Sequence, residues 1–138
     1  MIQILIQKFK NINHLIMTIP QITKIFDLDE RTFKFAKNVR QFLIKLPKSD
    51  ANREDGKQLI RSSGSVGANY IEANESLSKK DFILRIKICK KEAKESFYWL
   101  RLLDVGKENN QLEKERQSLA QEAFELTKIF GSIINKSK

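Results

Sequence analysis

The side chains that most often carry catalysis are scarce in this sequence. The sole histidine, His14, lies in the leading segment, so the rest of the chain cannot supply histidine-based triads, Cys/His zinc sites or the Glu-x-x-His pairs of di-iron bundles. Cys89 falls on an apolar stripe, where a buried packing residue is expected rather than a nucleophile. Carboxylate pairs three residues apart occur near lysines, as is typical of solvated helix charges: Glu72 with Glu75, and Glu92 with Glu95. We therefore expect no enzyme, no metal site and no cofactor.

A row of basic residues is the stronger candidate for function. Four of them recur every seven residues and a fifth falls on the same helix face: Lys80, Lys87, Lys94 and Arg101, with Lys91. Such a row spans about 30 Å on a helix, and duplex DNA carries a phosphate charge every ~1.7 Å of its axis. Three basic residues of an earlier segment are expected to add to the same basic side: Lys34, Lys37 and Arg40. The alternative is an ordinary solvated helix face.

The charge balance favours a polyanionic partner. The chain carries a net charge of +9, and residues 78–107 hold nine basic and four acidic residues. We expect no aromatic residue among the lysines of the row, so binding should be to the phosphate backbone and largely independent of base sequence. Tyr98 and Trp99 follow closely, and we expect one to fill the core and the other to contact a neighbouring molecule.

The run from Arg61 to Glu75, RSSGSVGANYIEANE, is unusual because a glycine costs about 1 kcal/mol relative to alanine inside a helix. It lacks the Lys-Ser/Thr of a phosphate-binding loop. Apolar residues keep their helical spacing on both sides, which predicts a continuous helix with one face of small residues. That face packs either on another helix of the same bundle or on a neighbouring protomer. The residues assigned to this helix-packing or oligomer interface are Ser63, Gly64, Gly67, Ala68, Asn69, Tyr70 and Asn74.

Helices must position these residues, because apolar residues recur at three- and four-residue spacing and proline and glycine are rare. Four helices are predicted at about 29–46, 51–77, 79–107 and 111–134, with Pro47 ending the first and Ser78 opening the third. Amphipathic helices joined by short loops predict an all-α, antiparallel up-down-up-down four-helix bundle, which we expect to assemble as a homo-oligomer.

The first 26 residues differ from the rest in their Ile/Asn/Lys-rich composition. Lys8 and Lys10 interrupt the apolar run, and no small-x-small cleavage site follows, so we expect neither a signal peptide nor a membrane anchor. We interpret residues 1–26 as a poorly attached extension or a mis-assigned start, and residues 27–138 as the bundle domain. The single cysteine excludes an intramolecular disulfide framework and suits a reducing cytoplasm.

Three stretches of the sequence closely resemble one bacterial family: Leu46-Pro47, then QLIRSSGSVGANYIEANES from Gln58 to Ser76, then SKKDFILRIKICKKEAKESFYWLRLL from Ser78 to Leu103. The members of this family are four-helix-bundle proteins often encoded in intervening sequences of 23S ribosomal RNA genes. The similarity covers about residues 27–136. The resemblance implies a homo-oligomer, typically a pentamer, with a basic surface and no established catalytic residues. A related protein is an accessory of diversity-generating retroelements that binds the reverse transcriptase and nucleic acid.

The sequence thus predicts a non-enzymatic, cytoplasmic, oligomeric bundle that binds RNA or DNA electrostatically. The alternative is a structural or accessory protein whose partner is another protein, such as a reverse transcriptase.

Overall fold

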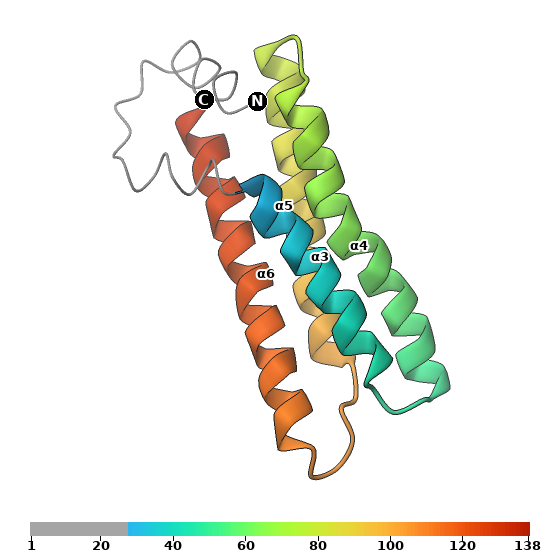
Figure 1. Ribbon diagram of the computed structural model, residues 1–138. Helices are drawn as coiled ribbons and strands as arrows, with labels where there is room; N and C mark the ends of the chain where they lie inside the picture. The colour runs from blue at the N-terminus through green and yellow to red at the C-terminus, as the bar shows by residue number, and fades with distance from the viewer. Residues whose placement is uncertain (1–27) are drawn as a thin grey trace.

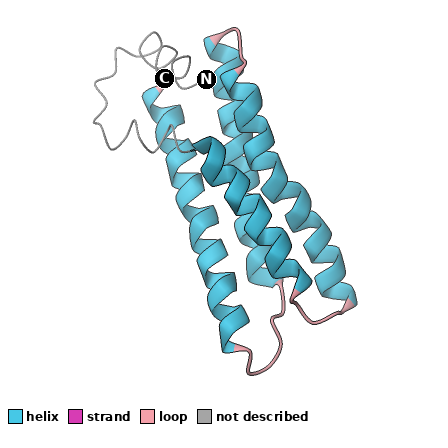
Figure 2. Cartoon of the chain, viewed as in Figure 1, coloured by secondary structure: helices cyan, strands magenta, loops and turns pink. Residues whose placement is uncertain are grey.

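The computed structural model describes residues 28–138, which fold into four α-helices and contain no strand (Figures 1 and 2). With the labels of Figure 1, these are α3 (Leu28–Ile44), α4 (Asp50–Asn74), α5 (Lys79–Leu102) and α6 (Asn110–Lys136). The predicted all-α class is confirmed. The extension predicted over residues 1–26 lies outside the described residues.

Polar side chains cap the N-termini of three helices, where they accept hydrogen bonds from backbone N–H groups that have no partner within the helix. The hydroxyl of Ser49 accepts from Asn52 N at 3.1 Å. That of Ser78 accepts from Asp81 N, and the amide oxygen of Asn109 accepts from Leu112 N, both at 3.1 Å. The opening of the third helix at Ser78 is therefore as predicted.

The third helix ends earlier than the sequence pattern indicated. Helix α5 stops at Leu102 rather than near residue 107, because Leu103 is already extended (φ −61°, ψ 142°). The next residue is bonded to another part of the chain, since Asp104 N donates to Asn52 Oδ1 at 2.9 Å. Gly106 then takes a positive φ of 88°, which a turn requires and glycine tolerates. A contact across 52 residues, invisible to local periodicity, thus ends the helix.

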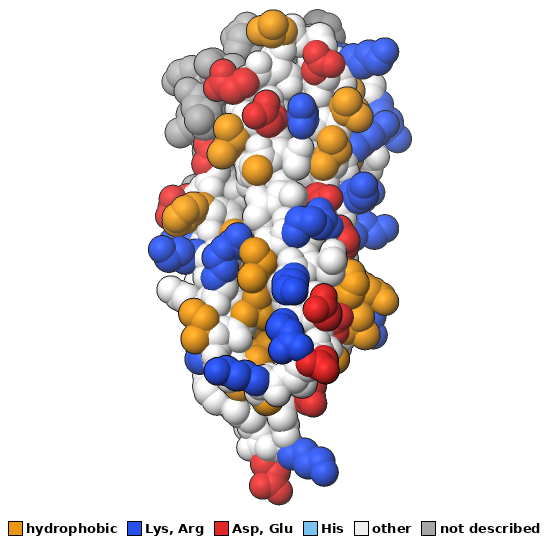
Figure 3. All heavy atoms as spheres, turned by 90° about the vertical axis from the view of Figure 1, so that its right-hand side faces the viewer, with side chains coloured by type: hydrophobic (Ala, Val, Ile, Leu, Met, Phe, Trp, Pro, Cys, Tyr) orange, Lys and Arg blue, Asp and Glu red, His pale blue; other side chains and the backbone are white. Residues whose placement is uncertain are grey.

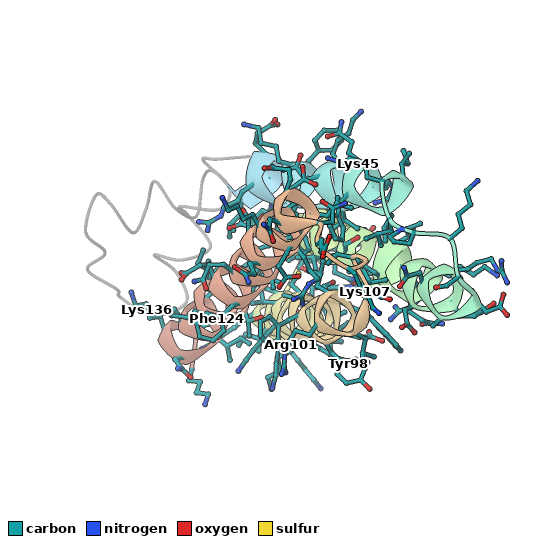
Figure 4. The ribbon with its side chains drawn as sticks, turned by 90° about the horizontal axis from the view of Figure 1, so that it is seen from below. Lys45, Tyr98, Arg101, Lys107, Phe124 and Lys136 are labelled. Atoms are coloured by element: carbon teal, nitrogen blue, oxygen red, sulfur yellow. The ribbon has the colours of Figure 1, made fainter. Side chains whose placement is uncertain are left out.

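The four helices lie side by side, with the connections at alternating ends of the molecule (Figure 1). Helix α5 packs along both α4 and α6, whereas α3 packs along α4 and less extensively along α6. Helices α3 and α5 hardly touch and lie across the bundle from each other, as the view along the helices shows (Figure 4). The core between them is built from fully buried large side chains, among them Phe35, Phe42, Tyr70, Phe82, Leu126 and Phe130.

The small-residue run forms part of one continuous helix, as predicted, and packs inside the chain. A Cβ atom added to Gly67 would lie 3.0 Å from Thr32 Oγ1 on α3. On the other side of α4, the buried hydroxyls of Ser62 and Ser96 are 2.8 Å apart and join α4 to α5. The run therefore lets two neighbouring helices approach α4 closely. Of the two alternatives left open by the sequence, packing within one bundle is the contact observed.

The other residues assigned to this interface divide between core and surface. Ser63 is buried, and Tyr70 and Asn74 are 1% and 2% exposed. Asn69 links two helices, because its Oδ1 accepts from Arg85 Nη1 of α5 at 3.1 Å. Gly64 faces the side chain of Arg40, and Ala68 is exposed to solvent. Contact of any of them with a second protomer stays a prediction.

Candidate nucleic-acid interface

The outward face of α5 carries the predicted basic row. The core-facing side of this helix is set by buried residues at helical spacing, including Phe82, Ile86, Cys89, Ala93 and Leu100. The basic residues fall on the opposite side, and all five are exposed: Lys80, Lys87, Lys91, Lys94 and Arg101. Among the described residues, none of the five makes an ion pair. Their charge is therefore directed to solvent and available to an anionic partner.

Two of the three acidic residues of α5, Glu92 and Glu95, are engaged elsewhere, and the third, Asp81, is exposed in the first turn. Arg61 of α4 reaches Glu92 at 3.2 Å and also pairs with Glu95. Trp99 Nε1 donates to Glu95 Oε1 at 3.4 Å. The Arg61 cation thus compensates both carboxylates on the side of α5 that faces α4.

The two carboxylates titrate differently. Burial raises the pKa of Glu92, whose side chain is 8% exposed, and the Arg61 charge opposes this only in part. Burial would also raise the pKa of Glu95, but its hydrogen bonds from Arg61 and Trp99 outweigh that and lower the pKa. At neutral pH the network holds Glu95 firmly as an anion and Glu92 less so.

The supporting basic residues lie on a different side of the molecule. Lys34, Lys37 and Arg40 are exposed, as predicted, but they belong to α3, which lies across the bundle from α5. Arg40 also folds back on its own helix, where its Nη1 donates to Ala36 O at 3.0 Å. The structure therefore does not bring these three residues to the α5 row, and one nucleic-acid strand along α5 would not reach them on the same protomer. A role of their own in binding remains a prediction.

The expectation that the row contains no aromatic residue is wrong. Tyr98 is 55% exposed and stands four residues after Lys94 and three before Arg101, on the same helix face. Its ring packs edge-on against Trp99, with centroids 5.0 Å apart and planes at 76°. Trp99 is partly buried and packs against the core, whereas contact of Tyr98 with a neighbouring molecule stays a prediction. The three- and four-residue spacing would have placed Tyr98 in the row.

Further aromatic and basic side chains from α5 and α6 continue this surface. The rings of Phe97 and Phe124 are 6.3 Å apart, which joins the two helices. Arg101 Cζ lies 5.5 Å from the ring centre of Phe97, and Lys128 Nζ lies 5.3 Å from that of Phe124. Figure 4 shows Tyr98, Arg101 and Phe124 along the same side of the bundle. We call this the aromatic-basic patch; it comprises Lys94, Phe97, Tyr98, Arg101, Phe124 and Lys128.

The neighbouring face, over α4, is more mixed. In the view onto the right-hand side of Figure 1, Lys and Arg side chains are interspersed with acidic and hydrophobic ones (Figure 3). Basic side chains also follow the upper right-hand edge of that view, with hydrophobic ones below them. Basic side chains on this face are thus mixed with acidic and apolar ones. The α5 row differs from them in that its basic residues recur at a regular helical spacing.

The candidate catalytic side chains take structural positions. Cys89 is fully buried, as predicted, and burial raises the pKa of its thiol to about 12, which keeps it protonated at neutral pH. Glu72 and Glu75 are exposed. Within residues 28–138, no three His, Cys, Asp or Glu residues gather in a way that could hold a metal ion. His14 lies outside that range. None of the described helices combines the length and hydropathy needed to cross a membrane.

These features define an all-α, four-helix protein with an exposed row of basic side chains along one helix. The chain belongs to the 23S rRNA-intervening sequence protein family, whose model matches residues 25–132. This confirms the resemblance recognised in the sequence. A crystal structure of a protein with unknown function from the S23 ribosomal protein family of Bacteroides thetaiotaomicron is similar, with 32% identity and a TM-score of 0.65. The similarity covers 78% of this chain and 97% of that one. No curated protein matches the chain.

Proposed function

We propose that this protein is a non-enzymatic, antiparallel four-helix bundle that assembles as a homo-oligomer in the cytoplasm and binds nucleic acid electrostatically. The observation that carries the proposal is the α5 row, whose five cations are exposed and make no ion pair among the described residues. Membership of a family named for intervening sequences of 23S rRNA is consistent with a nucleic-acid partner. The family resemblance also favours self-assembly, with a pentamer as the expected form.

The physical basis is the release of counterions from the phosphate backbone. Each phosphate that a lysine or arginine neutralises adds about −0.9 to the slope of log affinity against log salt for duplex DNA, and about −0.7 for single strands. A row that meets several phosphates should therefore show steep salt dependence. Contacts of this kind fix position without reading base sequence.

The test is binding of labelled RNA and DNA over a range of salt concentrations. The double variant Lys87→Glu, Lys94→Glu should weaken binding for all sequences alike and flatten the salt slope. The matched control is Lys34→Glu, Lys37→Glu, which makes the same change of charge on α3, across the bundle, and should weaken binding much less. Absence of binding at low salt would overturn the proposal, and equal losses from both variants would remove the α5 row from it.

A second candidate function is that of an accessory protein that binds another protein, such as a reverse transcriptase. It is favoured by a hollow of about 500 Å³ between the end of α3 and the start of α4. The hollow is lined in part by Leu43, Pro47 and two exposed isoleucines, Ile44 and Ile60. Recovery of the protein from its host separates the two candidates: nuclease treatment should release partners held through nucleic acid and leave a direct protein partner bound.

A further inference from the structure

We propose that the aromatic-basic patch on α5 and α6 stacks unpaired bases, so that the nucleic acid bound by this protein is single-stranded. The inference rests on the proposed function and names the form of nucleic acid that the same site takes. It departs from the sequence-based expectation of contacts to the phosphate backbone alone.

The first element of the site is the exposed ring of Tyr98 within the basic row. Lys94 and Arg101 stand about 6 Å and about 4.5 Å from it along the helix axis, at ~1.5 Å per residue. A base stacked on Tyr98 would therefore have a cation on each side within reach of its flanking phosphates. The edge-on contact with Trp99, at 5.0 Å between ring centroids, restricts the Tyr98 ring and so lowers the entropy lost on binding.

The second element is the cluster that joins α5 to α6. Phe124 is 46% exposed and lies on the same side of the bundle as Tyr98 and Arg101 (Figure 4). The Arg101 guanidinium lies 5.5 Å from the centre of the Phe97 ring. Bases stack on arginine planes as well as on aromatic rings in proteins that bind single-stranded RNA. The patch thus offers more than one surface on which successive bases could stack.

A single strand fits this arrangement better than a duplex does. In a duplex the bases are stacked on one another, and exposing a base face to a protein ring costs a few kcal/mol per step. A single strand has its base faces free, and stacking on an aromatic side chain contributes about 1–3 kcal/mol per base. The Tyr98 hydroxyl could donate to a phosphate of either form, but its exposed ring face can stack only on an unpaired base, so its place in the row favours the single strand.

Charge favours nucleic acid over a second copy of this chain as the occupant of the patch. Aromatic residues are also enriched at protein interfaces, so self-association has to be considered. However, Lys94, Arg101 and Lys128 stand within the patch, so a two-fold contact of the patch with itself would bring like charges together. In a ring such as a pentamer the patch would meet a different face, and the light-scattering arm of the test separates that case. A polyanion with flat rings complements both the charges and the aromatic surfaces.

The experiment compares one labelled oligonucleotide as a single strand and as a duplex, at fixed salt, with the parent protein, Tyr98→Ala and Tyr98→Phe. The parent should prefer the single strand. Tyr98→Ala should lower single-strand affinity by about 5- to 150-fold, the equivalent of one stacked base, and leave duplex affinity nearly unchanged, while Tyr98→Phe should stay close to the parent. Because Trp99 is the only tryptophan and contacts Tyr98, its fluorescence should change on addition of the single strand and change less in Tyr98→Ala.

Three results would overturn the inference. If Tyr98→Ala binds the single strand as the parent does while Lys87→Glu, Lys94→Glu binds weakly, the stacking site is wrong and the electrostatic function stands. If neither strand form binds at low salt, both proposals fail. If Tyr98→Ala lowers the mass of the assembly in light scattering and leaves the affinity per protomer unchanged, the patch is a contact between copies. Thermal unfolding by circular dichroism checks that each variant remains folded.

Discussion

At the scale of single residues, the two glycines of the small-residue run have different surroundings. A Cβ added to Gly64 would lie 3.4 Å from Arg40 Nη2, the flexible end of a surface side chain. One added to Gly67 would lie 3.0 Å from Thr32 Oγ1 and 3.3 Å from Thr32 Cβ. Thr32 is 1% exposed, and its hydroxyl donates to Leu28 O at 2.6 Å, so it has little freedom to move. Gly67 is therefore the position that sets the approach of α3 to α4.

This difference predicts that substitution by alanine stabilises the protein at Gly64 but not at Gly67. Gly64→Ala should raise the free energy of unfolding by about 0.5–1 kcal/mol, because alanine favours the helix and restricts the unfolded chain. Gly67→Ala gains the same amount but should lose about 1–3 kcal/mol to overpacking, so it should be neutral to destabilising by about 2 kcal/mol. Urea unfolding of the pair measures both. Equal stabilisation by the two substitutions would contradict the close approach at Gly67.

At the same scale, the sequence could have predicted that Tyr98 lies in the basic row, but not that Arg61 pairs with Glu92 and Glu95. The position of Tyr98 follows from its spacing to Lys94 and Arg101, which local periodicity contains. The engagement of Glu92 and Glu95 by Arg61 depends on how α4 lies beside α5, over a sequence separation of 31 and 34 residues. Sequence spacing within a helix carries no such information.

At the scale of the helices, Arg61 joins α4 to α5 through two carboxylates of unequal burial. Glu92 has a raised pKa because it is buried, so its ionisation weakens the folded state as the pH rises. Glu95 has a lowered pKa, so it contributes stability above its unfolded pKa that is lost as the pH falls through its folded pKa. The Arg61 guanidinium acts on both residues, because its charge lowers the pKa of Glu92 and of Glu95.

Removal of that cation should therefore matter more at neutral than at acid pH. In Arg61→Met, the ionised form of Glu92 would be buried without its partner at pH 7, and the contribution of Glu95 would largely disappear. We expect a loss of about 1–2 kcal/mol at pH 7, below the ~3–5 kcal/mol for breaking a fully buried pair, because Arg61 is half exposed. At pH 4 the Glu92 carboxyl, whose pKa is raised, approaches protonation, so its part of the difference from the parent should disappear and the deficit should shrink.

The control for this prediction lies on the same helix. Arg53 pairs with Asp50 at the surface, where the side chains are 60% and 94% exposed, and Arg53→Met should change stability little at either pH. Chemical unfolding at pH 7 and pH 4 compares all three proteins. An Arg61→Met deficit that is as large at pH 4 as at pH 7 would show that its cause is packing rather than the buried carboxylate.

At the scale of the whole molecule, one polar side chain closes an end of the bundle. Asn52 Nδ2 donates to Pro47 O and to Asp104 O, both at 2.9 Å, and its Oδ1 accepts from Asp104 N. These bonds join the connection between α3 and α4 to the connection between α5 and α6. Three backbone groups from loops far apart in sequence thus depend on one amide.

Asn52→Ala should accordingly destabilise the whole fold rather than one helix. Asn52 is 7% exposed, and its loss leaves three backbone groups without their partner, at a cost of about 1–3 kcal/mol. Circular dichroism and tryptophan fluorescence should report one common transition at a lower temperature. Asn38→Ala, an exposed asparagine on α3, is the control and should melt close to the parent. A melting temperature of Asn52→Ala equal to that of the control would mean that water replaces these bonds.

The sequence by itself determined the helices, their approximate ends and the outward direction of the α5 row. These features repeat every three, four or seven residues, and the period of the helix converts such spacing directly into one face. The motif from Arg61 to Glu75 likewise sufficed to recognise the family. All of this information is local, so it could be read without knowing which helices become neighbours.

Only the tertiary structure decided how these faces combine. It placed α3 across the bundle from α5, which separates Lys34, Lys37 and Arg40 from the basic row. It turned Glu92 and Glu95 toward Arg61, and it brought Phe124 of α6 beside Phe97 of α5. The physical reason is that helix neighbours are chosen by the packing of core side chains distant in sequence, and that choice fixes which surface residues meet.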